Sequence, residues 1–236
     1  MSRTAAAPFA AETLTVIIPT LNAAGRLGAT LDRVAEAKGA EVIVVDGHST
    51  DDTLSIATMH GAIWLQTDRG RGTQLRAGAA RANRPWLLFL HADTVLETGW
   101  MASAQAWADQ VGAKDGFAAF TLKFDDDGWR ARLLSALVGM RVRFLGGLPY
   151  GDQGLLIHRD LLGQVGGYAA IPIMEDVDLA RRLGRGRLSL LSAVAVTSAD
   201  RWRRDGWIRR SVRNRICLTL FQIGISPATI MRLYER

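Results

Sequence analysis

The sequence of 236 residues contains one cysteine, Cys217, and no long apolar run. A single cysteine excludes an internal disulfide framework, which fits a reducing compartment. A bilayer-spanning helix needs about 18–20 consecutive apolar residues, and the stretches 86–90 and 216–225 are too short. Residues 1–12 also lack the apolar core of a secretory signal. We therefore expect a disordered segment over 1–12 and a cytoplasmic protein, at most peripheral to the inner face of the membrane.

The composition is that of a globular protein with a sizeable core. Hydrophobic residues make up 48% of the chain and charged residues 22%. The sequence shows no internal repeat, low-complexity segment or interdomain linker. We therefore expect one continuous domain over residues 13–236.

Positive charge is concentrated near the end of the sequence. The net charge is +6, and seven arginines lie between Arg201 and Arg215 against one acid, Asp205. Such a segment could bind nucleic acid, anionic lipid or a diphosphate, and it could equally be a solvated helix face.

Strands and helices are predicted to alternate through the first half of the chain. Strands are expected over 14–19, 41–46, 62–66 and 86–90, and helices over 24–37, 51–60, 73–83 and 97–110. The strand at 86–90 is apolar at every position, so both of its faces should be covered. This alternation predicts an α/β fold with a parallel sheet, right-handed crossovers and Rossmann-like nucleotide binding.

The second half is less regular. We expect strands over 117–124 and 155–157, an extended segment over 188–196, and helices over 129–144 and 175–183. A basic and apolar helix is expected over 203–225. The glycine-rich stretch 146–154 is either a mobile loop close to substrate or a plain surface loop.

Acidic residues follow the predicted strands or begin a predicted helix. Asp46 ends the strand 41–46, Asp93 follows the strand 86–90, and Glu175 and Asp176 begin a helix. Ligands of open α/β sheets collect at the carboxyl ends of strands, where Asp46 could accept hydrogen bonds from a base or ribose. His91 and Asp93 should point to the same side of an extended segment, which suits a divalent cation shared with substrate phosphates.

Simpler interpretations of these polar residues exist. Ser49 or Asp51 could only cap the following helix, and an isolated Asp93 could only form a turn. Asp178 is expected to pair with Arg182 one helical turn later.

Taken in order, four segments resemble the signature motifs of family-2 glycosyltransferases. They are Val-Ile-Ile-Pro-Thr-Leu-Asn at 16–22, Val-Asp-Gly-His-Ser-Thr-Asp-Asp-Thr at 45–53, Leu-His-Ala-Asp-Thr at 90–94 and Met-Glu-Asp-Val-Asp-Leu at 174–179. The resemblance covers most of the chain, from about residue 14 to residue 202. It implies a single domain of the GT-A fold, with a Rossmann-like, mostly parallel sheet flanked by helices. Within it, a nucleotide-binding half (13–113) would precede an acceptor-binding half and basic C-terminal helix (114–236).

A narrower resemblance is to a bacterial branch of the family named for arsenosugar biosynthesis. It rests on Gly-Arg-Gly-Thr-Gln at 70–74, Gly-Asp-Gln-Gly at 151–154, Gly-Gly-Tyr at 166–168, Thr-Ser at 197–198 and Arg-Trp at 201–202.

The family resemblance implies a role for particular residues. Asp93 would bind a divalent cation, Mn²⁺ or Mg²⁺, and His91 replaces the first acid of the family's Asp-x-Asp motif, where it could serve as a second ligand. Asp176 would be the general base, with Glu175 beside it. The nucleotide would contact Pro19, Thr20, Asn22, Asp46, Arg71 and Asp93. The acceptor or diphosphate would contact Gly151, Asp152, Gln153, Arg201 and Trp202.

The expected activity is an inverting, metal-dependent transfer of a sugar from a nucleotide-diphosphate donor to a hydroxyl acceptor. A diphosphate leaves readily only when a cation or arginine meets its developing charge, and the acceptor hydroxyl needs a base. The expected partners are a nucleotide sugar and a small-molecule or lipid-linked acceptor, with weak contact to anionic membranes and no nucleic acid.

Two other function classes compete with this one. A nucleotide-binding oxidoreductase fits the alternating first half, but its Gly-x-Gly-x-x-Gly fingerprint is missing after the first strand, where Pro-Thr-Leu-Asn stands at 19–22. A non-enzymatic module could use the basic C-terminal segment on nucleic acid or acidic membrane, and it would not need Asp46, Asp93 and Asp176 where they are.

Overall fold

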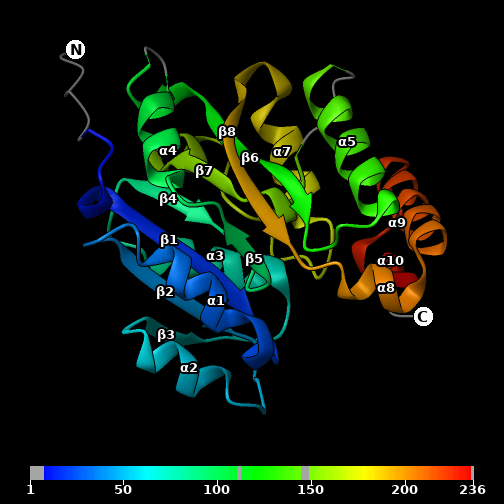
Figure 1. Ribbon diagram of the computed structural model, residues 1–236, viewed down its shortest axis with the longest axis horizontal. Coiled ribbons are helices and arrows are strands. Elements are labelled where there is room, and N and C mark those ends of the chain that lie inside the picture. The colour runs from blue at the N-terminus through cyan, green and yellow to red at the C-terminus, as the bar shows by residue number, and fades with distance from the viewer. Residues whose placement is uncertain (1–7, 111–112, 145–148, 235–236) are drawn as a thin grey trace.

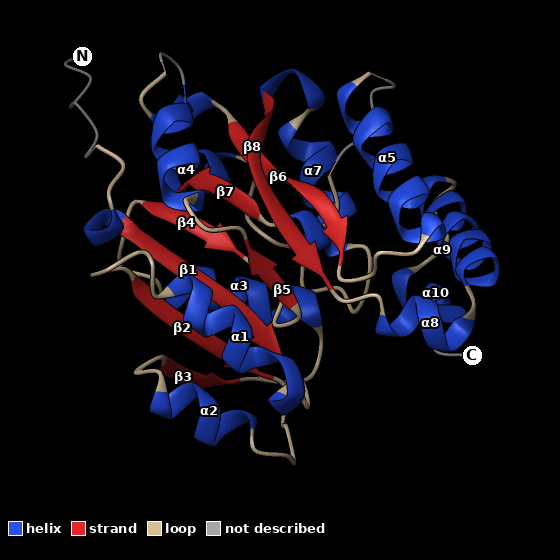
Figure 2. Ribbon diagram, in the orientation of Figure 1, coloured by secondary structure: helices blue, strands red, loops and turns tan. Residues whose placement is uncertain are grey.

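The computed structural model describes residues 8–110, 113–144 and 149–234. These residues form one sheet with helices on both of its faces (Figures 1 and 2). The spatial order of the strands is β3-β2-β1-β4-β7-β6-β8-β5. In chain order they are β1 (Leu14–Thr20), β2 (Glu41–Asp46), β3 (Ile63–Gln66), β4 (Trp86–Phe89), β5 (Thr94–Leu96), β6 (Phe117–Phe124), β7 (Leu155–His158) and β8 (Leu188–Thr197).

The helices connect and cover these strands. They are α1 (Ala24–Val34), α2 (Thr53–Met59), α3 (Arg71–Arg81), α4 (Trp100–Ala108), α5 (Trp129–Arg143), α6 (Arg159–Gln164), α7 (Glu175–Leu183), α8 (Asp200–Asp205), α9 (Trp207–Gln222) and α10 (Pro227–Tyr234). Short 3₁₀ turns occur at Ala11–Thr13, Ala113–Asp115, Gly151–Gln153 and Arg185–Arg187. None of the helices in the described part of the chain is long and apolar enough to cross a bilayer.

The first half confirms the predicted parallel sheet. β1 pairs in parallel with β2 and with β4, and β2 pairs in parallel with β3. Every residue of β1 and of β4 is buried, as expected for strands covered on both faces. Because the strands are parallel, their carboxyl ends meet at one edge, where Thr20 is the register partner of Asp46.

The second half completes a mixed sheet. β7 runs antiparallel to β4 and to β6, whereas β6 and β8 are parallel. β5, for which no element was expected from the sequence, pairs antiparallel with the end of β8 at the edge of the sheet. Short β5 therefore joins the chain just after Asp93 to the second half of the fold.

Two apolar layers lie on opposite faces of the sheet. Side chains of a strand alternate between its faces, so Val16 and Ile18 join one layer and Ile17 joins the other. The first layer also holds Leu27 and Leu31 of α1 and Trp100 and Trp107 of α4. The second layer is closed by Leu75 of α3, Leu161 of α6 and Leu179 of α7.

The C-terminal segment differs from the single helix predicted over 203–225. It folds into three helices, α8, α9 and α10, which lie together at one end of the molecule (Figure 1). Gly206 separates α8 from α9 with φ +83°, a left-handed conformation that an L side chain rarely adopts. Cys217 of α9 and Ile230 of α10 pack on Ile173, which ties these helices to the loop before α7.

The described part of the N-terminal segment also differs from expectation. Residues 1–7 of the expected disordered segment lie outside the described residues, as do 146–148 of the glycine-rich loop. Phe9, however, is buried, with its ring centroid 5.5 Å from that of Trp86 in an edge-on contact. This aromatic anchor, which a polar and alanine-rich composition conceals, orders residues 8–12 against the core.

Candidate active site

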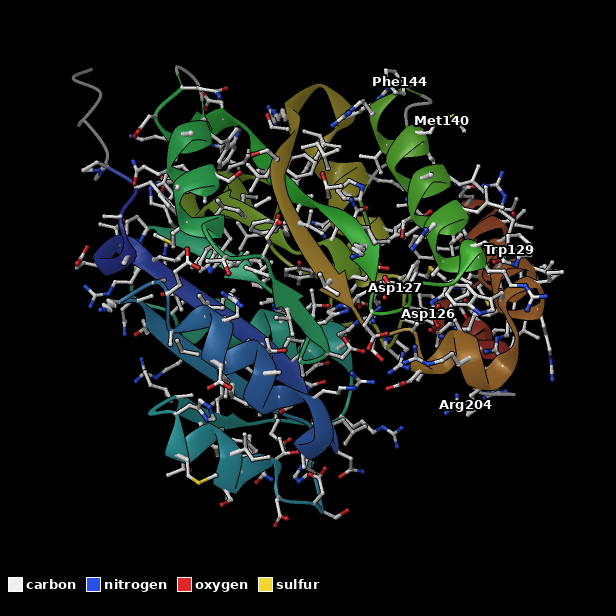
Figure 3. All side chains as sticks on the ribbon, in the orientation of Figure 1. Asp126, Asp127, Trp129, Met140, Phe144 and Arg204 are labelled. Atoms are coloured by element: carbon white, nitrogen blue, oxygen red, sulfur yellow. The ribbon has the colours of Figure 1, made fainter. Side chains whose placement is uncertain are left out.

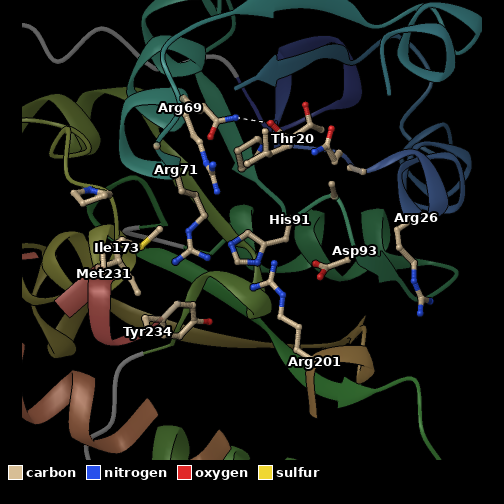
Figure 4. A pocket seen from close by; sticks show the side chains of 18 of the residues that line it. Thr20, Arg26, Arg69, Arg71, His91, Asp93, Ile173, Arg201, Met231 and Tyr234 are labelled. Carbon is tan, nitrogen blue, oxygen red and sulfur yellow. Dashed lines mark hydrogen bonds between the residues drawn. The ribbon is translucent and has the colours of Figure 1, made fainter. Parts of the chain in front are cut away.

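A large cavity opens at the carboxyl ends of the parallel strands. Its volume is about 1020 Å³, enough for a nucleotide with an attached sugar. One wall comes from the first half of the chain, with Pro19, Thr20 and Asn22 after β1 and Asp93 after β4. The opposite wall comes from the C-terminal helices, where Tyr234 of α10 is exposed to the cavity. Figure 4 shows this cavity with ten of its residues labelled.

The ends of β1 and β2 are fixed by buried hydrogen bonds. The Thr20 hydroxyl donates to Oδ1 of Asp46 over 3.0 Å, and the Ser49 backbone N–H donates to Oδ2 over 2.7 Å. Gln74 of α3 donates from Nε2 to the carbonyls of Thr20 (2.7 Å) and Val45 (2.8 Å). Asp46, which was expected to contact the base, is fully buried and does not line the cavity. Its hydrogen bonds instead fix the ends of β1 and β2.

Asn22 shapes the loop on the other side of the strand ends. Asn22 adopts a left-handed backbone conformation with φ +49°. Its backbone N–H donates to Oγ of Ser49 over 2.8 Å, and its side-chain oxygen accepts from the backbone N–H of Thr50 over 2.9 Å. The Asp51 carboxylate accepts from the backbone of Ala24, and its pKa is lowered chiefly by the hydrogen bond from Thr53. Asp51 therefore links the loop before α1 to the loop before α2, and it does more than cap the following helix, which was one alternative.

Arg71 and Glu175 form an ion pair on the wall of the cavity. Arg71 Nε donates to Oε1 of Glu175, whose side chain has no exposed surface. Burial raises the pKa of Glu175, which the Arg71 guanidinium opposes. Although burial opposes it, the charges of Glu175 and Asp176 raise the pKa of Arg71, which therefore stays protonated. Glu175 lines neither of the two neighbouring cavities, whereas its ion-pair partner Arg71 lines both.

His91 lies between Arg71 and Arg201. The two arginine side chains reach toward it from opposite walls (Figure 4). Burial first, and then the charges of these two arginines, lower the pKa of His91 well below its ordinary value. The imidazole is therefore neutral at pH 7 and can accept a hydrogen bond or bind a metal.

A smaller cavity of about 180 Å³ adjoins the large one. Both are lined by Arg71, His91, Asp93 and Arg201. The smaller cavity adds Asp152 and Asp176, together with Tyr150, Trp202 and Leu218. It therefore combines carboxylates with an aromatic and apolar wall, next to the point where Asp93 lies.

Asp176 is held in this small cavity by backbone hydrogen bonds. Its Oδ2 accepts from the N–H of Gly151 over 2.7 Å, and its Oδ1 accepts from the N–H of Val177 over 2.7 Å. A Cβ on Gly151 would lie 2.5 Å from Nε2 of His91, so only glycine lets this loop approach so closely. Gly151 thus spaces Asp176 from His91.

Asp152 is the most perturbed carboxyl group of the small cavity. Burial raises its pKa to about 6, and the negative charges of Asp176 and Asp93 add to the rise. Its Oδ1 is buried without a hydrogen-bond partner among the described residues. A carboxyl group tuned in this way can hold or release a proton close to neutral pH.

Arginines dominate the charge of the large cavity. Seven of them line it, against two carboxylates, Asp93 and Asp205. Asp205 is already paired with Arg204 and Arg210, at 2.9 and 2.8 Å, and with Arg213. The Tyr234 hydroxyl accepts from Arg210, and the guanidinium carbon of Arg210 lies 5.0 Å from the Tyr234 ring centre. The cavity thus presents a strongly positive surface that suits a diphosphate.

The donor atoms available for a metal are few. The described residues contain no group of three or more His, Cys, Asp or Glu side chains placed to hold an ion. Asp93 and neutral His91 do lie at the junction of the two cavities. One carboxylate and one imidazole fit a Mg²⁺- or Mn²⁺-type site only when substrate phosphates supply further oxygen ligands.

The structure brings together most of the predicted site residues, with exceptions. Gln153 is buried and donates from Nε2 to the carbonyl of Phe120 over 3.0 Å, so it supports the fold away from the cavities. Trp202 stacks on Trp207 with ring centres 5.7 Å apart, and it presents part of its surface to the small cavity. Asp178 pairs with Arg182 over 2.6 Å, which confirms the predicted helix pair.

Some lining residues were missed in the sequence. Gln74 lies in the Gly-Arg-Gly-Thr-Gln stretch at 70–74, and a glutamine on a helix face that should be apolar was a usable signal. Arg210 and Arg213 were seen only as part of a basic segment. Tyr234 gave no local signal, because α10 reaches the cavity only through the turns that separate α8, α9 and α10.

Comparison with known proteins agrees with this geometry. The family model described as glycosyl transferase family 2 matches residues 15–171, which is more than half of the chain. The chain belongs to glycosyl transferase family 2. The match includes the β1, β2 and β4 strand ends and the loop of Gly151, and it stops just before Glu175 and Asp176.

Curated relatives in the family come from mycobacteria. A PGL/p-HBAD biosynthesis glycosyltransferase of Mycobacterium tuberculosis is 41% identical over 97 residues, which are 37% of this chain and 38% of the relative. An uncharacterized glycosyltransferase of the same species is 30% identical over 150 residues, 61% of this chain and 66% of the relative. The matched segment thus spans well under half of the first relative's length.

Solved structures share the fold at low sequence identity. The mannosyltransferase PcManGT from Pyrobaculum calidifontis, in complex with GDP-Man and Mn²⁺, has a TM-score of 0.65 and 18% identity, covering 94% of this chain and 68% of that one. Glucosyl-3-phosphoglycerate synthase from Mycobacterium tuberculosis, with Mn²⁺, uridine diphosphate and glucosyl-3-phosphoglycerate, has a TM-score of 0.59 and 21% identity, covering 90% and 80%. These likenesses establish the GT-A architecture of the chain.

Proposed function

We propose that this protein transfers a sugar, with inversion, from a nucleotide-diphosphate donor to a hydroxyl acceptor. The observation that carries the proposal is the arginine-lined cavity at the strand ends, joined through Asp93 and His91 to a smaller cavity with Asp152 and Asp176. Two adjoining spaces would hold a donor and an acceptor close together, with a carboxylate within reach of the acceptor hydroxyl.

The donor nucleotide would occupy the large cavity. Its base and ribose would contact Pro19, Thr20 and Asn22, above the buried Asp46 that holds the strand ends. The diphosphate would contact Arg71 and Arg201, which face His91. These fixed positive charges stabilise the negative charge that develops on the leaving diphosphate, and they do so in a site that is already organised.

A divalent cation would be held by Asp93, with His91 as a second ligand and the donor phosphates completing its shell. When bound, the ion adds positive charge at the leaving diphosphate. Arg71 and Arg201 contribute to the same charge balance from the protein itself.

Acceptor activation would fall to Asp176. The carboxylate faces the small cavity, on the side of the site that α7 provides, whereas Asp93 comes from the end of β4. A base on a different element from the diphosphate contacts can take the acceptor proton while its oxygen attacks opposite the leaving group. Glu175 would position Arg71 through their ion pair.

The identities of the acceptor and of the transferred sugar are suggested by two weaker observations. The mycobacterial relative is named for PGL/p-HBAD biosynthesis, and the matched segment covers 38% of it. These names give no support to the narrower resemblance to the arsenosugar branch, which stays a prediction. The aromatic and apolar wall of the small cavity favours an acceptor whose hydroxyl is carried by an apolar or aromatic group.

A thermal-shift screen tests the proposal. Nucleoside diphosphates and nucleotide sugars are added with Mn²⁺, with Mg²⁺ or with a chelator, and dinucleotides serve as the arm for an oxidoreductase. We expect stabilisation by a nucleoside diphosphate of about 2.7 kcal/mol at a hundredfold its dissociation constant. Stabilisation by a dinucleotide alone would favour the oxidoreductase and contradict glycosyl transfer.

A further inference from the structure

Helix α5 exposes an apolar stripe to solvent. Trp129 (68% exposed) and Phe144 (70%), which directly follows the helix, mark its ends. Between them the side chains of Leu133, Leu137 and Met140 are each about half exposed. These residues recur every third or fourth position and so share one face of the helix. Figure 3 shows the labelled Trp129, Met140 and Phe144 along the outer side of α5.

This stripe is additional to the face that α5 uses for folding. Ala131 is buried with Leu122 and Phe124 of β6, and Leu134 and Val138 pack against the same cluster. A helix with its inner face already buried has no need of apolar side chains on its outer face. Contiguous exposed apolar surface of this kind marks an interaction site.

Helix α9 repeats the pattern beside it. Ile208 (78% exposed), Val212 (53%) and Ile216 (46%) lie four residues apart on its outer face. The two helices are neighbours, because Trp207 of α9 packs against the same buried cluster as Leu134 and Val138 of α5. The Arg141 guanidinium of α5 also lies 4.2 Å from the ring centre of Tyr150. We call these exposed apolar residues of α5 and α9 the α5–α9 face.

The charged side chains within α5 and α9 are all positive, although the exposed Asp127 lies just before α5. Residues 129–144 contain four arginines and no acid, and residues 207–222 contain four arginines and no acid. Arg130, Arg132 and Arg143 of α5 and Arg209 and Arg215 of α9 are exposed. A second copy of the chain would set like charges against one another, whereas an anionic surface would be attracted.

We propose that the α5–α9 face docks on an anionic lipid bilayer. Apolar side chains on one side of a helix, flanked by arginines, suit a helix that lies in the interface between headgroups and acyl chains. Each arginine near an anionic surface adds to the attraction, and salt screens it. The docking is peripheral, since none of the described helices can span the membrane.

Docking has a consequence for the acceptor, which rests on the proposed function. Tyr150 and Leu218, which line the small cavity, come from the segments next to α5 and from α9. A membrane bound to the α5–α9 face would therefore lie near the space assigned to the acceptor. This position suits an acceptor hydroxyl carried on a lipid.

Vesicle flotation tests the docking. The wild-type protein is floated at low salt with phosphatidylcholine vesicles that contain or lack phosphatidylglycerol, and again at high salt. We expect binding only with phosphatidylglycerol and its loss at high salt. Trp129→Ser combined with Phe144→Ser, and Arg130→Gln combined with Arg132→Gln and Arg143→Gln, should each lower the partition coefficient by about tenfold or more.

A matched control lies on α2, which is remote from α5 in Figure 1. Leu54 (49% exposed) and Met59 (73%) are replaced by serine and should leave flotation unchanged. All of the substituted residues are exposed, so every variant should keep the wild-type nucleotide-dependent thermal shift. Failure of docking is therefore separable from failure of the proposed function. Absent flotation at low salt, or equal loss in the α2 control, would overturn the proposal. So would a dimer in sedimentation velocity that the Trp129→Ser and Phe144→Ser pair abolishes, since the face would then bind a second copy.

Discussion

The backbone N–H of Gly151 donates to Oδ2 of Asp176 over 2.7 Å, and this bond joins the loop between α5 and β7 to the start of α7. A Cβ on Gly151 would lie 2.5 Å from Nε2 of His91, so this glycine stands next to both the expected base and the expected metal site. Asp93 and Asp176, the carboxylates assigned to the leaving group and the acceptor, come from different elements and both line the small cavity.

Replacement of Asp176 by asparagine should reduce turnover and spare donor binding. The amide oxygen can still accept one of the two backbone hydrogen bonds, but the group no longer takes a proton. We expect kcat to fall by about 10²–10⁴-fold, the usual contribution of a general base, with the donor dissociation constant nearly unchanged. Steady-state kinetics and donor titration measure the two quantities.

Glu175→Gln is the matched comparison for that variant. Because Glu175 is buried against Arg71, its loss should lower the free energy of unfolding by about 1–3 kcal/mol and weaken donor binding, with a smaller fall in kcat. Wild-type turnover in Asp176→Asn together with an inactive Glu175→Gln would transfer the role of base to Glu175.

The acid strength of Asp152 predicts a pH-dependent stability. Its pKa is about 6 in the folded protein, and its ordinary value, which we take for the unfolded chain, is 3.8. Between these values the folded state therefore binds more protons than the unfolded state. Stability should therefore fall as pH rises from about 4 to 6, and the loss should be complete above that window.

Asp152→Asn removes this titration. Relative to wild type, the variant should gain about 1–3 kcal/mol in free energy of unfolding between acid and neutral pH. Denaturant unfolding of both proteins at several pH values provides the measurement. A constant difference across this range would mean that Asp152 is not strained by burial.

Gly72 near the start of α3 should tolerate no side chain. A Cβ there would lie 2.6 Å from the carbonyl oxygen of Ile171, in the loop that leads to the cavity residue Ile173. Gly72→Ala should cost about 1–3 kcal/mol in stability and weaken donor binding, because the backbone must move. Gly139→Ala in α5, where a Cβ meets nothing within 4 Å, should instead stabilise by about 0.5–1 kcal/mol. Equal melting points for the two variants would contradict the close packing of the loop on α3.

Asp93→Asn should distinguish the metal-dependent part of nucleotide binding from the metal-independent part. The variant should lose most of the metal-dependent part of the thermal shift produced by a nucleoside diphosphate, while the melting point without ligand stays nearly unchanged. The reason is that Asp93 is the one carboxylate at the junction of the cavities that is assigned to the ion. If a chelator has no effect on nucleotide binding to wild type, Asp93 has no metal to hold.

Local sequence patterns predicted the first half of the fold and much of the site. β1 to β4 are apolar runs with regular helical spacers, and polar residues directly after them must meet at one sheet edge. That argument placed Asp93 at the cavity, whereas Thr20 and Asn22, which also line it, were implied only by the family resemblance. It could not tell that Asp46 would be saturated by Thr20 and Ser49, because those bonds depend on the loop conformation.

The second half was harder for a physical reason. β5 has three residues, too few for a periodic pattern, and it exists because β8 offers it a partner. The break at Gly206 divides the expected helix into α8 and α9, and a second turn at Gly224 leads into α10. These two turns bring Arg210 and Tyr234 to the cavity. Contacts between residues distant in sequence decide these features, and no local pattern encodes them.

Isothermal titration of a nucleotide sugar into the protein tests the central claim, that the arginine-lined cavity is a donor site. We predict one molecule bound per chain. Because Arg201 lines the cavity and is proposed to contact the diphosphate, Arg201→Gln should weaken binding by about tenfold or more. Arg185→Gln, on an exposed turn after α7, should bind as wild type does. Equal affinity in Arg201→Gln and wild type, or no binding of any nucleotide sugar with or without a divalent cation, would contradict the account.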